Sequence, residues 1–254
     1  MDPDVGALGQ LIDRAHAILI LTGAGISTAS GIPDFRGPNG IWKTERPVHF
    51  DQFLASEKHR RAYWDQKVRA ATVFQDAKPN RVHDACVELE QVGKVEVIVT
   101  QNIDGLHSDA GTSTDRLVEI HGTAREAACL SCDIRTPIEV HIDSYLRTDN
   151  VPICNECGGL VKPATISFGQ SLDPVSLDRA QQSAERCDLV VALGSTLGVY
   201  PAARIPYAPT SRGVPYAIVN KGETEHDGWP TLTLRIDGDV TLVFPEAVQA
   251  ALAG

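Results

Sequence analysis

The chain has 254 residues, of which 43% are hydrophobic and 22% charged, and its formal net charge is −10 at pH 7. There are enough apolar side chains to build a core, which excludes a largely disordered chain. The acidic charge disfavours nucleic-acid partners, and no apolar run approaches the ~20 residues of a membrane span. The N-terminus lacks the basic and apolar regions of a secretion signal, so we expect a cytoplasmic protein without membrane partners.

Short aliphatic runs bounded by turn residues recur along the chain and predict strands. They cover residues 17–22, 95–100, 188–193, 215–220 and 232–236. Each is too short for an isolated helix and is rich in Val, Ile and Leu, as strands buried on both faces of a parallel sheet are. Helical patterns lie between several of them, at residues 81–91 and 176–187. Strands that alternate with helices predict an α/β fold with right-handed crossovers.

Two segments interrupt this alternation. Residues 50–75 predict one or two helices, and residues 129–157 contain two Cys-x-x-Cys pairs separated by 21 residues. Pairs at this spacing can present four thiolates tetrahedrally to Zn²⁺, and four cysteine ligands leave no position for a metal-bound water. We therefore expect one structural Zn²⁺ at Cys129, Cys132, Cys154 and Cys157. The two remaining cysteines, Cys86 and Cys187, fall in predicted helices and are expected to be ordinary buried thiols.

A glycine-containing turn follows the first predicted strand, in the run Gly23-Ala24-Gly25-Ile26-Ser27. Glycines at such a turn let backbone N–H groups approach a pyrophosphate at the start of a helix. The dinucleotide fingerprint G-x-G-x-x-G is incomplete, because Thr28 stands at the third glycine position. For this run alone, a plain strand-to-helix turn stays open as the alternative.

The next loop concentrates polar and aromatic side chains between Gly31 and Gly37. Its Asp34, Phe35 and Arg36 offer an acceptor for ribose hydroxyls, a ring that can cover a flat ligand and a cation for phosphate. Loops of this composition are more often functional than structural. The loop therefore favours a binding role for this part of the chain.

Polar side chains also follow the predicted strand at residues 95–100. Gln101, Asn102 and Asp104 stand where a parallel sheet has its ligand crevice, beyond the carboxyl ends of its strands. Each could instead cap the following helix, but the three together favour binding. His121 ends another apolar run, and its ordinary pKa of ~6.5 suits a general base if the ring faces the crevice. A histidine satisfied within the core is the alternative.

Taken in order, these motifs resemble those of the sirtuins, a family of NAD-dependent protein lysine deacylases, and the resemblance covers nearly the whole chain. It implies a Rossmann-like parallel sheet in a large domain, with a smaller lobe, made of a zinc-binding and a helical module, inserted into it. The expected bounds are 1–37, 76–125 and 163–254 for the discontinuous NAD-binding domain, 38–75 for the helical module and 126–162 for the zinc-binding module.

The resemblance also implies roles for individual residues. An acylated lysine of a protein or peptide would enter the cleft between the lobes, and His121 and Asn102 would be catalytic. The substrate backbone would be clasped as an added strand by extended segments at Phe168, Gly169, Leu197, Gly198 and Val199. NAD, the co-substrate, would contact Gly23, Ala24, Gly25, Asp34, Phe35, Arg36, Gln101, Asn102, Ile103, Asp104, Gly194, Ser195, Thr196, Asn220 and Val240.

The implied reaction transfers the acyl group to ADP-ribose. The acyl oxygen attacks the ribose carbon that bears nicotinamide, in a closed pocket that excludes water and so prevents wasteful hydrolysis of NAD. His121 would act as general base on a ribose hydroxyl. The products would be the deacylated lysine, nicotinamide and O-acyl-ADP-ribose.

Departures from the family pattern leave the acyl preference open. Gln170 stands where many bacterial members have Glu, and Lys67 and Ala70 replace the Tyr-x-x-Arg pair of succinyl-preferring members. Mono-ADP-ribosyl transfer to protein is the alternative on the same scaffold. A hydride-transferring dehydrogenase is disfavoured by the incomplete glycine fingerprint. A non-catalytic zinc-ribbon module would leave the polar residues at 101–104 and His121 without a role.

Overall fold

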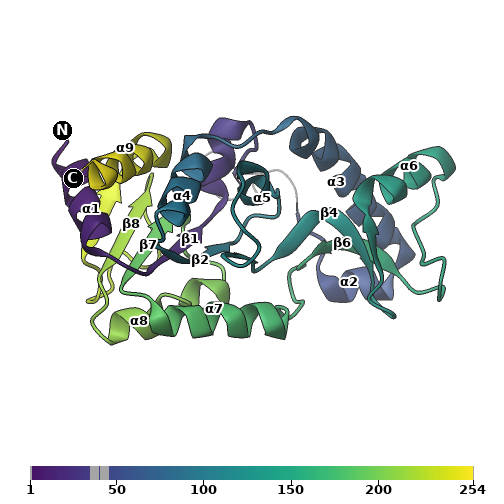
Figure 1. Ribbon diagram of the computed structural model, residues 1–254. Helices are drawn as coiled ribbons and strands as arrows, with labels where there is room; N and C mark the ends of the chain where they lie inside the picture. The colour runs from purple at the N-terminus through teal and green to yellow at the C-terminus, as the bar shows by residue number, and fades with distance from the viewer. Residues whose placement is uncertain (1, 35–39, 41–45, 254) are drawn as a thin grey trace.

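The computed structural model describes residues 2–34, 40 and 46–253, which form a large lobe and a small lobe (Figure 1). The large lobe is built on a six-stranded sheet in the order β3-β2-β1-β7-β8-β9, in which every neighbouring pair is parallel. This is the strand order of doubly wound dinucleotide-binding folds, so the predicted Rossmann-like sheet is confirmed. Its strands are β1 (Ile18–Thr22), β2 (Val95–Thr100), β3 (Leu117–Glu119), β7 (Leu189–Leu193), β8 (Tyr216–Asn220) and β9 (Leu234–Asp237).

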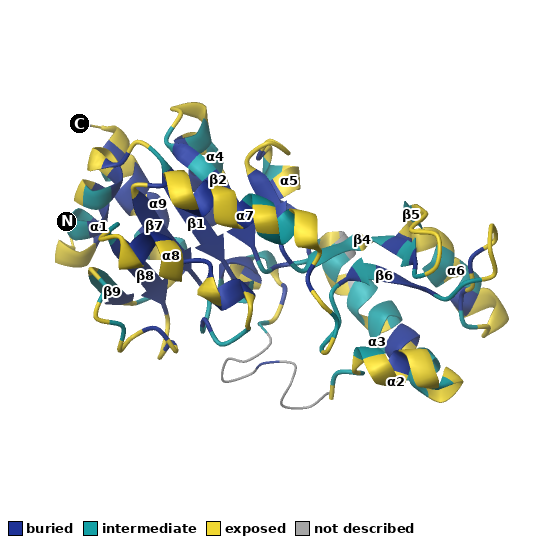
Figure 2. Ribbon diagram, turned by 90° about the horizontal axis from the view of Figure 1, so that it is seen from below, coloured by how far each residue is buried: buried dark blue, intermediate teal, exposed yellow. Residues whose placement is uncertain are grey.

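Helices cover both faces of this sheet, which explains why its strands are mostly aliphatic. Because successive strand residues point to opposite faces, Ile18 and Ile20 pack under one layer of helices and Leu19 and Leu21 under the other. The first layer contains α1 (Pro3–Arg14), α4 (Arg81–Gln91) and α9 (Val240–Leu252), and the second contains α7 (Pro174–Arg186) and α8 (Tyr207–Ser211) (Figure 1). In Figure 2 the central strands between the two layers are buried, and the edge strand β9 is more exposed.

The small lobe has its own antiparallel sheet, in the order β5-β4-β6. Two helices precede it and a third packs on it, with Trp64, Ile138, Tyr145 and Val161 in their common core. The segment predicted as one or two helices is two, divided at Ser56. The elements are α2 (Phe50–Ala55), α3 (Glu57–Asp76), β4 (Gly122–Cys129), β5 (Arg135–Pro137), α6 (Ile138–Thr148) and β6 (Val161–Thr165).

Local structure agrees with the predictions to within about two residues, with two differences. The glycine turn leads into a 3-10 helix, Ala24–Ser30, rather than a regular α-helix. Cys187 follows the last residue of α7 instead of lying inside it, although its thiol is buried as expected. Short helices also occur at α5 (Leu106–Ala110) and at Ala202–Arg204. Among the residues described, no helix combines the length and apolarity needed to cross a membrane. The residue bounds of the three modules stay predictions.

Candidate active site

The strand order reverses between β1 and β7, and the loops after these two strands pack directly on one another. Gly23 N donates to Leu193 O (3.0 Å), and Gly25 N donates to Gly194 O (2.8 Å). A Cβ on Gly25 would lie 2.7 Å from the Cα of Gly194, so backbone meets backbone and no side chain fits. In open α/β sheets such a reversal point is where ligands bind, at the carboxyl ends of the strands. The glycine turn is therefore placed where a dinucleotide would be held.

Polar side chains from the loop after β2 close a network around this turn. Asn102 Nδ2 donates to Gly23 O (3.2 Å) and to Ser27 Oγ (3.0 Å), and Ser27 Oγ donates to Asp104 Oδ2 (2.7 Å). Gln101 Nε2 donates to Ser195 Oγ (3.0 Å) in the loop after β7. These side chains therefore lie against the glycine turn and the loop after β7. Asp104 also accepts from Leu106 N (2.9 Å), the first residue of α5, whose N-cap is Gly105.

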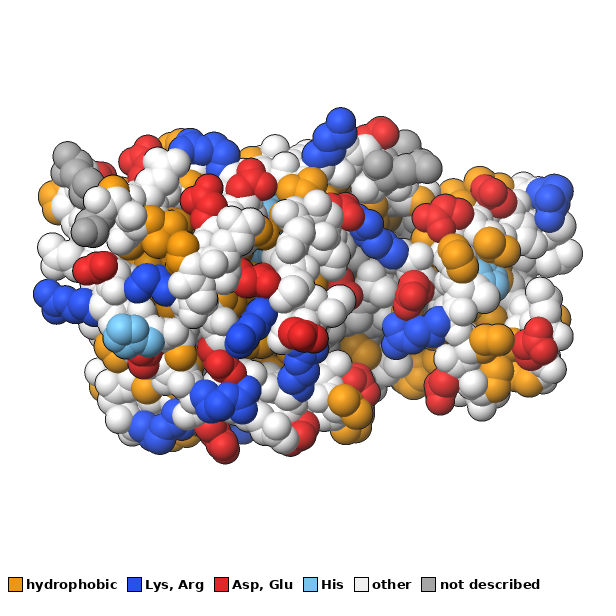
Figure 3. All heavy atoms as spheres, viewed as in Figure 1, with side chains coloured by type: hydrophobic (Ala, Val, Ile, Leu, Met, Phe, Trp, Pro, Cys, Tyr) orange, Lys and Arg blue, Asp and Glu red, His pale blue; other side chains and the backbone are white. Residues whose placement is uncertain are grey.

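Two adjoining cavities open beside this network. A small cavity of about 10 Å³ is lined by Ala24, Ser27, Ile32, Phe74, Asn102, Ile103 and Asp104. A larger one of about 390 Å³ shares Phe74, Ile103 and Asp104 with it and extends between α3 and α6, past Lys67 and Ala70. Figure 3 shows the molecule narrowed between the lobes on this face, with side chains of both charges on either side.

The ring of His121 lies against the same loop. Its Nδ1 is 3.0 Å from the carbonyl oxygen of Gln101, and because a carbonyl only accepts, Nδ1 carries the proton. The neutral ring therefore keeps its lone pair on Nε2. Burial lowers the pKa of His121, while the bond to Gln101 raises it, so the neutral form predominates at neutral pH. Gly122 is required next to it, since a Cβ there would lie 2.0 Å from Ala164 O.

The segment after β6 connects the histidine to the helical module. Ile166 N donates to His121 O (2.8 Å), and Phe50 N donates to Phe168 O (2.9 Å). Phe168 is thus held between the lobes, and the exposed Gly169 follows it. The other expected substrate segment differs from prediction at Leu197, whose φ of +56° and buried side chain make it a bend rather than extended chain. Gly198 and Val199, which follow it, are half-buried.

The remaining predicted cofactor residues, apart from Asp34, lie at or within three residues after the end of another strand. Asn220 ends β8 and its Nδ2 donates to the carbonyl oxygens of Lys221 and Gly222 (both 3.1 Å). Thr196 accepts a hydrogen bond from Glu225 N (3.0 Å), and Val240 is the first residue of α9. Asp34 is half-buried. The predictions for Phe35 and Arg36 lie outside the described residues.

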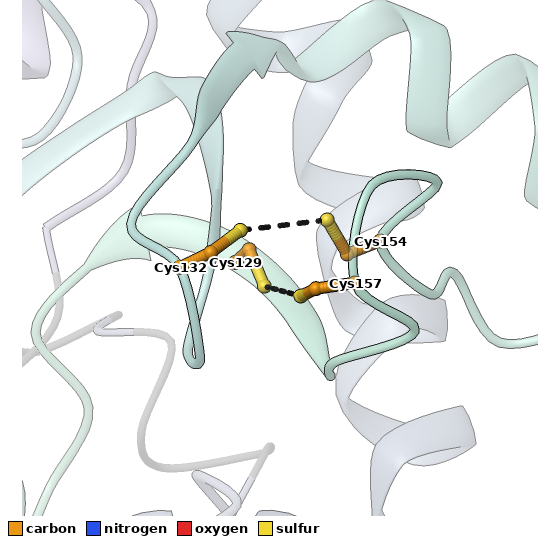
Figure 4. Close-up of side chains that lie close together, drawn as sticks. All are labelled: Cys129, Cys132, Cys154 and Cys157. Atoms are coloured by element: carbon orange, nitrogen blue, oxygen red, sulfur yellow. Dashed lines mark hydrogen bonds between the residues drawn. The ribbon is translucent and has the colours of Figure 1, made fainter.

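The four paired cysteines converge at the tip of the small-lobe sheet (Figure 4). Their sulfur atoms all lie within 4.8 Å of one another, with Sγ–Sγ distances of 3.5 Å for Cys129–Cys157 and 3.7 Å for Cys132–Cys154. These distances are too long for disulfides, whose S–S bond is ~2.05 Å. They match the ~3.8 Å edge of a tetrahedron with Zn–S bonds of ~2.3 Å. The donor set therefore fits a closed, structural Zn²⁺ site.

Glycine lets the two cysteine turns approach. A Cβ on Gly159 would lie 2.9 Å from Cys129 Sγ and 2.5 Å from Ser131 Oγ.

The two other thiols, of Cys86 and Cys187, are buried as predicted. Burial raises the pKa of Cys86, and it raises the pKa of Cys187 to about 11.

Two residues of the site received no role from the sequence. Ser27 links Asn102 to Asp104, and its place in the glycine motif could have suggested this. Arg125, on β4 of the small lobe, contacts the loop after β2, and no local sequence pattern predicts that contact.

Fold and site together define a dinucleotide-binding protein of the Rossmann type with an inserted zinc module. The Sir2 family model matches residues 23–201, and the chain belongs to this family. The NAD-dependent protein deacetylase of Rhodopseudomonas palustris is 41% identical over 238 residues, covering 94% of both chains. That of Thermotoga maritima is 39% identical over 229 residues, covering 90% of this chain and 91% of the other.

Solved structures of Sir2 proteins have the same fold as this chain. A structure described as the basis for the mechanism and regulation of Sir2 enzymes superposes with a TM-score of 0.88 at 33% identity, covering 100% of this chain and 99% of the other. A Sir2 protein with a p53 peptide and NAD⁺ gives a TM-score of 0.85 at 34% identity, covering 96% and 97%.

Proposed function

We propose that the chain is an NAD-dependent protein lysine deacylase that transfers the acyl group of a modified lysine to ADP-ribose. The observation that carries this is His121, whose Nδ1–H is held by Gln101 O beside the network of Asn102, Ser27 and Asp104. This places a neutral base next to a built nucleotide site at the reversal point of the sheet. Relatives named as NAD-dependent protein deacetylases support the assignment.

Each part of the site has a distinct task in this reaction. NAD supplies the ADP-ribosyl acceptor and nicotinamide as leaving group. The glycine turn receives the pyrophosphate through backbone N–H groups, and Asn102 and Asp104, fixed by Ser27, shape the nicotinamide end. His121 takes a proton from a ribose hydroxyl at Nε2, because Nδ1 is engaged. The residues of this site are mostly buried, which keeps water from competing with the acyl oxygen.

The zinc module acts structurally in this proposal. Zn²⁺ at the four cysteines would tie the two turns to the end of β4, the strand that begins beside His121. With four thiolate ligands the metal takes no part in the chemistry. The substrate is a protein or peptide with an acylated lysine, whose backbone binds beside Phe168 and Gly169. We also propose a cytoplasmic location, which the free state of the cysteines supports.

The experiment is mass spectrometry of an acetyl-lysine peptide incubated with the protein, with and without NAD. We expect NAD-dependent loss of acetyl matched by equal amounts of nicotinamide and O-acetyl-ADP-ribose. His121→Ala should lower all three signals by about 10²-fold or more, and His16→Ala, an exposed histidine of the large lobe, is the matched control. Release of nicotinamide together with transfer of ADP-ribose to protein would instead support mono-ADP-ribosylation. A protein that consumes no NAD with acetyl, longer acyl or protein acceptors is not this enzyme.

A further inference from the structure

Arg125 reaches from the small lobe onto the loop that carries Asn102 and Asp104. Its Nε donates to the carbonyl oxygen of Asp104 (3.2 Å), and its Nη1 donates to Asp109 Oδ1 (2.8 Å) on α5. Its Nη2 pairs with the second carboxylate oxygen of Asp109, which completes a bidentate ion pair. One residue earlier on β4, Ala124 N donates to Ile103 O (2.8 Å). A single strand of the small lobe thus holds residues 103–109 at both ends.

A second observation shows that this contact is built into the loop. Gly105 has a φ of +74°, and a Cβ at that position would lie 2.1 Å from Arg125 Nε and 2.8 Å from its Cζ. The guanidinium occupies the space that a side chain at position 105 would need. Backbone conformation and side-chain space therefore both require glycine where Arg125 crosses the chain.

The loop held in this way forms one end of the nucleotide site. Ile103 and Asp104 line both cavities described above, and Asp104 completes the network through Ser27. Ser195 and Asn220, which the family resemblance assigns to the adenosine half of NAD, make their hydrogen bonds outside residues 103–109, to Gln101 and to the carbonyl oxygens of Lys221 and Gly222. A change at Arg125 should accordingly act on the nicotinamide end and spare the adenosine end.

We propose that Arg125 is a positioning residue for the nicotinamide end of the NAD site, clamping residues 103–109 against β4. The inference rests on the proposed function for the assignment of that end. Arg125 works through the loop and touches no reacting atom. Lysine cannot replace it fully, because a single ammonium cannot serve the Asp104 carbonyl and both Asp109 oxygens in the planar geometry of a guanidinium.

The test compares the binding of two ligands by calorimetry: NAD, and ADP-ribose, which lacks nicotinamide. We expect Arg125→Ala to weaken NAD binding about five- to tenfold, the effect of losing one or two net hydrogen bonds from the loop, and to leave ADP-ribose binding within about twofold. Arg125→Lys should recover part of the loss. Arg135→Ala, which removes an exposed arginine–carboxylate pair with Glu126 from the same sheet, is the matched control and should change neither affinity.

The outcomes separate a positioning role from a structural one. Equal affinities in Arg125→Ala and wild type, or equal weakening of both ligands, would overturn the inference. If Arg125→Ala does not fold, Asp109→Asn decides in its place, since it breaks the ion pair but keeps the bond to Asp104 O. A wild-type protein that binds no NAD would contradict the proposed function and this inference together. One that binds NAD without deacylating peptides would contradict the proposed reaction alone.

Discussion

The ionisation of Glu119 should make the protein less stable as the pH rises. It ends β3, two residues before His121, with its carboxyl group partly buried. Burial, reinforced by the nearby Asp104, raises the pKa of Glu119 from 4.5 to about 7, while Arg125 opposes the rise. Between pH 4.5 and about pH 7, the carboxyl group of Glu119 is therefore protonated in the folded protein and ionised in the unfolded chain.

The sign and size follow from proton linkage. Because the folded-state pKa is raised, the stabilisation is present below the unfolded pKa and is lost as the pH rises through about 7. The full loss is about 3 kcal/mol before solvent screening, which the partial exposure of the side chain reduces. Glu119→Gln, which imitates the protonated form, should remove this dependence. Its advantage over wild type should grow by about 1 kcal/mol between about pH 6 and pH 8.5.

Urea unfolding of wild type and Glu119→Gln, followed by circular dichroism at both pH values, measures this difference. The contributions of the other titrating groups to the pH dependence cancel in this difference, because both proteins contain those groups. The measurement at the lower pH serves as the internal control. An advantage that is the same at both pH values would refute the reasoning. A variant less stable than wild type at the higher pH would show that the ionised carboxylate is stabilised, with Arg125 as the cation that supplies the attraction.

Three further predictions test the site directly. His121→Ala should lower kcat about 10²–10⁴-fold with NAD affinity retained. Because the pKa of His121 is lowered, the acid limb of the wild-type kcat/KM profile should have its midpoint below pH ~6.5, and a midpoint above that value would contradict the assignment. Cys154→Ser should reduce bound zinc, measured by mass spectrometry, from one equivalent and lower solubility, whereas a folded, zinc-free and fully active variant would show that the metal is not structural. Gly25→Ala should destabilise the fold by about 1–3 kcal/mol and weaken NAD binding, because its Cβ would meet the Gly194 backbone, while Gly228→Ala, with open space around it, should change neither.

Much of the large lobe can be predicted from the sequence because its physics is local. A strand covered on both faces is aliphatic at most positions, so runs such as residues 189–193 indicate buried parallel strands by their composition alone. The cysteine spacing is equally local, since each Cys-x-x-Cys turn preforms half of a tetrahedral site. The polar residues after β2 are recognisable because the end of a strand fixes where its loop emerges.

Other features depend on contacts between distant segments, which leave no local pattern. Only the fold decides that Gly25 meets Gly194, that Gln101 O fixes the proton of His121 on Nδ1, and that Gly105 makes room for Arg125. The bend at Leu197 is not predictable from residue type, because leucine rarely adopts a left-handed backbone conformation, and its side chain is buried in the tertiary structure. The sequence alone therefore determined the strands, the metal ligands and the kind of site. The tertiary structure decided how these parts face one another, because distances between segments far apart in the chain are set by packing.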